Sequence, residues 1–240
     1  MSKNTKKIIW PNTAERFVAF FDIMGFTQMV FRESHDIVKN KLYKLKEIIS
    51  SIDTFYETEK TESIIRTVLF SDSIMIVSNN NTKDAIRHVC SSAACFQRMC
   101  LVGQIPVKGA IAHGNMTCDF DQSIYFGRPL IDAYKLQQDL VLYGTILHNT
   151  AEVKTKDYGM EDKLVKYLTP FKSGKTNHVN IDWIHPLDIG GYKMDPNAVV
   201  ETLYNAVSGQ TRIYVDNTLD FVSMVYKVQS AIQMHCVTSF

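Results

Sequence analysis

Two aspartates lie next to strongly apolar segments of this 240-residue chain. Asp22 follows the apolar residues of "FVAFFDIMGFT", and Asp72 lies in "SDS" between two β-branched runs. A buried strand does not tolerate an unpaired carboxylate, so each acid is expected at a strand end, facing a ligand. Two carboxylates held close together repel each other unless a cation neutralises them or one stays protonated. The pair predicts a site for Mg²⁺ or Mn²⁺, ions that take carboxylates and substrate phosphates as ligands.

The residues after Asp22 favour phosphate binding. Gly25 allows a sharp turn, after which the backbone amides up to Thr27 are expected to begin a helix. Backbone amides at the start of a helix bind phosphate, and together with a metal site they would suit a nucleoside triphosphate. Each aspartate alone also fits a solvent-facing cap or turn residue. Only the combined pattern favours a site.

Hydrophobic periodicity predicts the elements that must position the acids. Apolar residues at steps of three and four predict a helix over 35–56, and the runs around Asp72 predict a hairpin beside the strand that carries Asp22. Both acids would then converge at one edge of a sheet. We expect the order β-α-β-β-α-β-β-α-β, an α+β fold. The other elements expected are strands over 16–23, 107–116, 140–149 and 164–172, and helices ending near 102 and starting after Gly127.

Composition excludes several classes of protein. A net charge of +1 argues against a general nucleic-acid binder, and no apolar run approaches the roughly 20 residues of a membrane span. The five cysteines include no C-x-x-C pair, which favours reduced thiols in a cytoplasmic protein.

Residues 1–176 are expected to form the catalytic domain. Residues 177–240, with two amphipathic helices, would form an extension packed on the core or at a dimer interface.

Four motifs resemble the class III nucleotidyl cyclases. "FFDIMGFT" resembles the family's "FxDIxGFT", and "SDSIM" resembles its "GDxxM", with Ser71 in place of glycine. "VKGAIAHG" is similar to "RxGIxxG", and "FGRPLIDAYKL" to "WGxxVNxAxRM". The resemblance covers Phe17 to Lys175. It implies a class III cyclase-like (ferredoxin-like) sheet with helices packed on it.

The resemblance also implies roles for individual residues. Two ions, Mn²⁺ or Mg²⁺, would be held by Asp22 and Asp72, helped by the carbonyl of Ile23. The amides of Gly25, Phe26 and Thr27 would hold phosphate. Lys172 in "PFKSGK" would reach the triphosphate like the lysine of the family's "KGKG", although a solvated loop lysine is an equal alternative.

Several positions depart from the family pattern. The family's ribose-binding asparagine and transition-state arginine fall on Ile131 and Lys135. Lysine can neutralise charge but lacks the two-pronged guanidinium, and an exposed helix lysine is the alternative interpretation. The residues that select adenine fall on Val68 and Ile124, which cannot hydrogen-bond to a base edge. Adenine specificity of the usual kind is therefore not expected.

Within the family, the chain looks most like the pyrimidine cyclases of bacterial Pycsar anti-phage systems. These make cyclic UMP or cyclic CMP, which activates a separate effector protein. Arg66 is predicted to contact the base, the alternative being a strand-edge arginine facing solvent. Class III sites form between two subunits, so the chain is expected to be a symmetric homodimer.

Three other functions remain open at this point. A degenerate cyclase-like domain could bind a nucleotide as a sensor, which fits the missing asparagine and arginine but not the two retained acids. A purine cyclase would keep the chemistry and change the base. A diguanylate-cyclase-like enzyme would need a "GGDEF"-like hairpin, which "FSDSI" does not supply.

Overall fold

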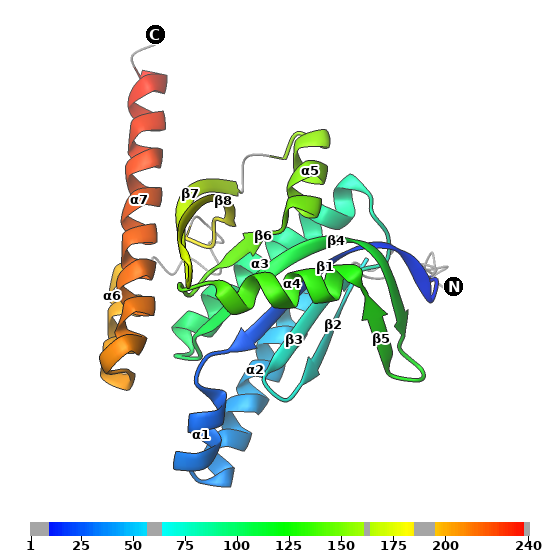
Figure 1. Cartoon of the computed structure of the whole chain (residues 1–240), viewed down its shortest axis with the longest axis horizontal. Helices are drawn as coiled ribbons and strands as arrows, with labels where there is room; N and C mark the ends of the chain where they lie inside the picture. Colours follow the sequence, from blue (N-terminus) through cyan, green and yellow to red (C-terminus); the bar gives the residue numbers. More distant parts are fainter. Residues whose placement is uncertain (1–9, 57–63, 161–163, 185–194, 238–240) are drawn as a thin grey trace, which may run out of the picture.

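The computed structural model describes residues 10–56, 64–160, 164–184 and 195–237. Its sheet has the strand order β2-β3-β1-β4-β6-β8-β7, and β5 pairs with the end of β4. The strands are β1 (Thr13–Ile23), β2 (Ile65–Phe70), β3 (Ser73–Ser78), β4 (Val107–Asp119), β5 (Ile124–Gly127), β6 (Thr145–Leu147), β7 (Leu164–Phe171) and β8 (Gly174–Ile181). The helices are α1 (Phe26–Arg32), α2 (His35–Tyr56), α3 (Lys83–Val102), α4 (Arg128–Asp139), α5 (Asn149–Asp157), α6 (Pro196–Thr202) and α7 (Arg212–Val237). The expected α+β fold is confirmed (Figure 1).

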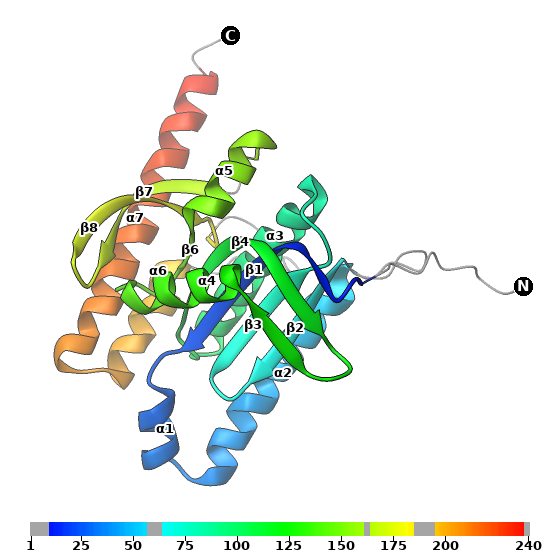
Figure 2. The same cartoon turned by 45° about the vertical axis from the view of Figure 1, so that its right-hand side comes forward.

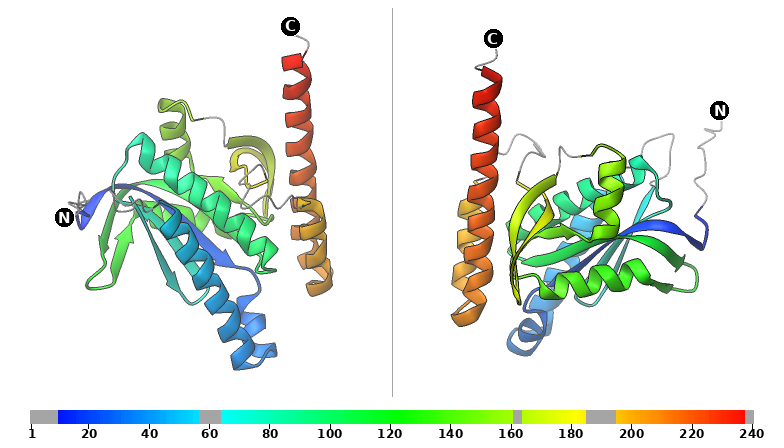
Figure 3. Two further views of the ribbon diagram at one scale, coloured as in Figure 1. Left: turned by 180° about the vertical axis from the view of Figure 1, so that it is seen from behind. Right: turned by 45° about the horizontal axis from the view of Figure 1, so that its top comes forward.

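The central strand β1 is covered on both faces. It pairs antiparallel with β3 and with β4. On one face Phe21 contacts Phe96 of α3, with ring centroids 4.8 Å apart, and on the other Phe20 contacts Tyr134 of α4 at 5.5 Å. Helices α2 and α3 lie side by side on the first face, whereas α4 crosses the second (Figure 3). Because side chains alternate along a strand, Asp22 is on the same face as Phe20, the face that α4 crosses.

Two segments differ from the expected elements. The strand expected over 140–149 is reduced to β6, because His148 caps a new helix, α5, by accepting a hydrogen bond from the amide of Thr150. The extended segment near 178 belongs to β8, which pairs with β7 along its whole length. The expected domain boundary at 176/177 therefore falls inside a strand of the sheet, and a two-domain division stays a prediction.

The C-terminal residues 195–237 form α6, two short 3₁₀ turns and the long helix α7. The N-terminal half of α7 packs beside β7, where Phe221 meets Tyr167 with ring centroids 5.2 Å apart. Its C-terminal half extends beyond the sheet (Figures 1 and 2). In the described ranges, no helix combines the length and the hydrophobicity needed to cross a membrane.

Candidate active site

The two acids meet at the end of β1. Asp22 pairs in the sheet with Ser73, the first residue of β3, which directly follows Asp72. The amide of Ile23 donates a hydrogen bond to the carbonyl of Asp72 at 3.0 Å. The sheet register therefore brings the acid of the β2–β3 turn beside the acid of β1, as the hairpin pattern predicted.

The electrostatics around Asp22 fit a cation site. Burial raises the pKa of the Asp22 carboxyl, the nearby Asp72 raises it further, and Lys108 partly offsets both. Two neighbouring carboxylates supply hard oxygen donors of the kind that Mg²⁺ and Mn²⁺ prefer, and the Ile23 carbonyl, next along the chain from Asp22, would be a third. Within the described part of the chain, no three His, Cys, Asp or Glu side chains gather to hold a metal by themselves. The remaining ligands would have to be water and the oxygens of a bound phosphate.

The turn that carries Asp72 has an unusual backbone. Ser71 adopts a φ of 55°, in the left-handed region that favours glycine. Cyclases of the resembled family have glycine at this position of the "GDxxM" motif. Ser71 therefore adopts a backbone conformation that glycine would adopt more easily.

The segment after Asp22 forms the expected turn and helix start. The amide of Met24 donates to the carbonyl of Pro106 at 2.8 Å, and Gly25, with a φ of 76°, caps α1. The amide of Met29 donates to the carbonyl of Gly25 at 2.9 Å. Amides in the first turn of a helix have no partner within the helix, so those of Phe26 and Thr27 are available to a ligand.

Lys108 belongs to this site, although sequence reasoning missed it. It is the direct partner of Asp22 in the ladder between β1 and β4, and only 5% of it is exposed. Its ammonium donates to the carbonyl oxygens of Gln138 at 3.1 Å and of Leu140 at 3.4 Å. Burial lowers the pKa of Lys108 to about 8; Lys172 contributes to the lowering, and Asp22 opposes it. The available signal was a basic residue inside the otherwise apolar strand of "VKGAIAHG".

Lys172 lies at the same end of the sheet. It is exposed in the turn between β7 and β8, and its backbone amide donates to the carbonyl of Asp139 at 2.8 Å. That bond places the turn beside Gln138 and Leu140, whose carbonyls hold the ammonium of Lys108, so both lysines belong to the same end of the sheet. The structure thus groups Asp22, Asp72 and the start of α1 with two lysines.

Lys135 and Ile131 lie on the exposed side of α4, and 54% of Ile131 is accessible to solvent.

Arg66 lies far from Asp22 within one chain. It is on β2, two strands from β1, and four residues farther along the sheet, which is roughly 16 Å at usual sheet spacings. Its guanidinium carbon lies 4.6 Å from the ring centroids of both Trp10 and Phe120. Within one chain, neither Arg66 nor the exposed face of α4 joins the two acids.

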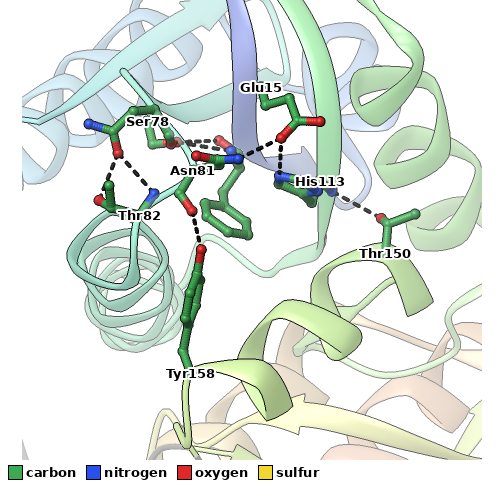
Figure 4. A network of polar contacts seen from close by, with 9 residues as sticks. Glu15, Ser78, Asn81, Thr82, His113, Thr150 and Tyr158 are labelled. Carbon is green, nitrogen blue, oxygen red and sulfur yellow. Dashed lines mark hydrogen bonds and ion pairs between the residues drawn. The ribbon is translucent and has the colours of Figure 1, made fainter.

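A second polar cluster occupies the opposite end of β1 (Figure 4). The carboxylate of Glu15 accepts a hydrogen bond from Asn81 at 2.5 Å and lies 4.0 Å from the ring of His113. The amide of His113 donates to the hydroxyl of Thr150 at 3.0 Å, and the hydroxyl of Tyr158 donates to the carbonyl of Asn81 at 2.7 Å. These bonds tie α5 to β1, to β4 and to the start of α3, so we assign the cluster a structural role.

Comparison with solved structures finds the same fold in nucleotide cyclases. The guanylate cyclase domain of RhGC from Catenaria anguillulae, in complex with GTP, matches with a TM-score of 0.54 and 14% identity, over 71% of this chain and 98% of that one. The adenylyl cyclase CyaB from P. aeruginosa matches with a TM-score of 0.52 and 14% identity, over 74% and 98%. A rhodopsin-guanylyl cyclase core with converted specificity, in complex with ATPαS, gives 0.53 and 14%, over 70% and 95%. The chain therefore has the fold of class III cyclase catalytic domains. No protein-family model matches the sequence, and no curated protein is similar to it in sequence.

Proposed function

We propose that this protein is a nucleotidyl cyclase that converts a nucleoside triphosphate to a 3′,5′-cyclic nucleotide and pyrophosphate. The observation that carries the proposal is the meeting of Asp22 and Asp72 at the end of β1, with Lys108 paired beside Asp22. Acids, a lysine and free amides gathered at one sheet end suit a triphosphate that carries its own divalent cation. The fold shared with adenylyl and guanylyl cyclases supports the same reaction class.

In this reaction the ribose 3′-hydroxyl attacks the α-phosphorus and pyrophosphate leaves. Two Mn²⁺ or Mg²⁺ ions would be held by Asp22, Asp72 and the carbonyl of Ile23. When bound, they would lower the pKa of the 3′-hydroxyl and neutralise the charge of the phosphates. The amides of Gly25, Phe26 and Thr27 would bind phosphate oxygens. Lys108 would orient the triphosphate by a charge-assisted hydrogen bond.

The remaining predicted residues fit a site shared between two subunits. Ile131, Tyr134 and Lys135 are exposed on α4, and Phe126 of β5 is 61% exposed. In a symmetric homodimer this surface of one subunit would face the acids of the other. Lys135 would then neutralise charge on the α-phosphate of the partner's substrate, and Lys172 would contact the triphosphate.

We propose a pyrimidine substrate, UTP or CTP. Val68 is half-buried and Ile124 is exposed, and neither can hydrogen-bond to the edge of a purine. Arg66 is the proposed base contact: its guanidinium packs against the rings of Trp10 and Phe120, which are perpendicular to each other, and its N–H donors would bind the base. The cyclic product would act on a separate effector protein, as in anti-phage signalling.

The deciding experiment is incubation of purified protein with Mn²⁺ and each of the four ribonucleoside triphosphates separately, with products identified by mass. A cyclic pyrimidine nucleotide supports the whole proposal, and Asp72→Ala should abolish it. Cyclic AMP or GMP would keep the reaction and overturn the base assignment. Nucleotide binding without product would favour the sensor function, which the residues Ile131 and Lys135 in place of asparagine and arginine also fit.

A further inference from the structure

Helix α7 is bonded to the linker that joins α4 to β6, residues 140–144. The side-chain amide of Asn217 donates to the carbonyl of Val141 at 2.6 Å. The backbone amide of Tyr143 donates to the hydroxyl of Thr218 at 2.9 Å. Thr218 is fully buried and Asn217 nearly so; the bond of Thr218 is buried and that of Asn217 is partly buried. The N-terminal half of α7 therefore fixes the backbone of the α4–β6 linker.

The same linker holds Lys108. Its ammonium has three N–H donors, and two of them bond to the carbonyls of Gln138, at the end of α4, and Leu140, in the linker. The ring of Tyr214, from the first turn of α7, lies 5.8 Å from this ammonium, within reach of a cation–π interaction. That ring stacks on Tyr143, with centroids 5.6 Å apart and planes 24° apart.

These contacts confine the ammonium of Lys108 and use two of its three donors. Two carbonyls and an aromatic face surround it, and Asp22 is its partner in the sheet, so we assign the third donor to a ligand bound beside Asp22. The side chain of Lys108 is long and flexible, so without confinement it would lose rotamer entropy on binding a phosphate. A ring that confines it in advance reduces that loss.

We infer that Tyr214 is a positioning residue that holds Lys108 ready for the triphosphate, and that α7 is in this way part of the catalytic unit. This inference rests on the proposed function, because it assigns Lys108 to phosphate binding. Tyr214 itself does not touch substrate. It acts through the ammonium of Lys108 and through Tyr143.

The test compares Tyr214→Leu, which removes the ring, with Tyr214→Phe, which keeps it. Affinity for pyrophosphate, the leaving group, is measured in the presence of Mn²⁺ by titration calorimetry, and kcat and KM are measured with the accepted nucleotide. The cost of ordering one flexible side chain on binding, which the ring supplies in advance, corresponds to roughly a 2- to 12-fold change in affinity. We expect Tyr214→Leu to weaken pyrophosphate binding and raise KM by about that factor, and Tyr214→Phe to stay within about two-fold of the wild type.

Phe221→Leu is the matched control, because it also removes a buried ring from α7 but one that contacts Tyr167. It should lower the melting temperature and leave pyrophosphate affinity unchanged. In a Lys108→Met background, Tyr214→Leu should have no further effect on that affinity. If Tyr214→Leu does not fold, Tyr214→Met serves in the same comparison.

Unchanged pyrophosphate affinity in Tyr214→Leu, or an equal loss in Phe221→Leu, would overturn the inference. The proposed function fails separately, if the wild-type protein cyclises none of the four nucleotides. The pyrophosphate titration still reports on Tyr214 in that case, because it does not need turnover.

Discussion

The backbone amide of Ile23 donates a hydrogen bond to the carbonyl of Asp72, with the nitrogen and oxygen 3.0 Å apart. Ile23 directly follows Asp22, so this bond between β1 and the β2–β3 turn links the backbones of the two acids. Their carboxylates are thereby kept near each other although they repel, and the pKa of Asp22 rises as a result of burial and of that repulsion. Such an arrangement is typical of a site that a cation completes.

Asp22→Asn should stabilise the metal-free protein and remove its response to metal. The folded protein raises the pKa of Asp22, so the charged form of this group destabilises the folded state at neutral pH, and the penalty disappears as pH falls through that pKa. With EDTA, the variant should melt at a higher temperature than the wild type. With Mn²⁺ at 100 times its Kd, the wild type should gain about 2.7 kcal/mol, or roughly 5–10 °C, and the variant much less.

The control for that variant is Asp121→Asn, which removes the same charge from an exposed position of the turn between β4 and β5. Its melting temperature should stay close to that of the wild type, both with EDTA and with Mn²⁺. An equal Mn²⁺ response in Asp22→Asn and the wild type would remove Asp22 from the metal site.

Lys135→Ala should lower kcat far more than it raises KM. The proposed role of Lys135 is to neutralise charge that develops at the α-phosphate in the transition state, and such an interaction contributes little to substrate binding. Steady-state kinetics with the accepted nucleotide measures both constants. A raised KM with unchanged kcat would make Lys135 a substrate-binding residue instead.

Mixing Asp72→Ala with Lys135→Ala chains should restore activity that neither variant has alone. In a mixed dimer one site receives intact acids from one chain and an intact lysine from the other, while the second site receives both defects. Half of the dimers are mixed at equal exchange, so about a quarter of wild-type activity is expected. The absence of any recovery, with subunit exchange verified by mass, would argue that each chain forms its own site.

Ser71→Gly should stabilise the protein by about 0.5–1 kcal/mol. A left-handed conformation costs a residue other than glycine roughly 1–2 kcal/mol, and glycine removes this strain. The greater conformational freedom of glycine in the unfolded chain offsets about 0.5–1 kcal/mol of the gain. Thermal unfolding should show a rise of about 1–4 °C. Ser73→Gly, two residues along in β3, relieves no such strain and should lower the melting temperature; equal effects of the two changes would refute the explanation.

Stability should fall as the pH drops below about 6.5, the ordinary pKa of histidine. Burial lowers the pKa values of His113 and His178, although Glu15 and Glu152 partly offset it. Below pH 6.5 the unfolded chain therefore binds more protons than the folded one, which favours unfolding until the pH passes the lowered pKa values. Melting temperatures between pH 7.5 and 5.5 measure the effect. His178→Gln should reduce the slope, and an unchanged slope would exclude His178 as a contributor.

The sequence was sufficient for features that depend on neighbouring residues. The turn at Gly25, the hairpin around Asp72 and the helical period of α2 are local patterns, and the structure places all three where they were expected. The convergence of the two acids followed from them, because a hairpin beside a strand leaves little freedom for its tip. The roles of Lys135 and Arg66 came from the resemblance alone and stay predictions.

Other features depended on contacts between distant residues. Lys108 entered the site because the register of β1 against β4 makes it the partner of Asp22, and no local pattern specifies that register. The close packing of Phe21 on Gly109, where a β-carbon would lie 2.5 Å from the ring, belongs to the same register. The packing of Arg66 against Trp10 and Phe120 likewise joins three separate segments.

By itself the sequence determined the two acids, the turn at Gly25, and the order of strands and helices as far as β6, because hydrophobic period and turn chemistry act over a few residues. Only the tertiary structure decided that Lys108 is the cation beside Asp22 and that Tyr214 of α7 contacts this lysine. Those choices depend on which strands pair and which helix covers the sheet edge, and more than a hundred residues of chain separate Lys108 from Tyr214.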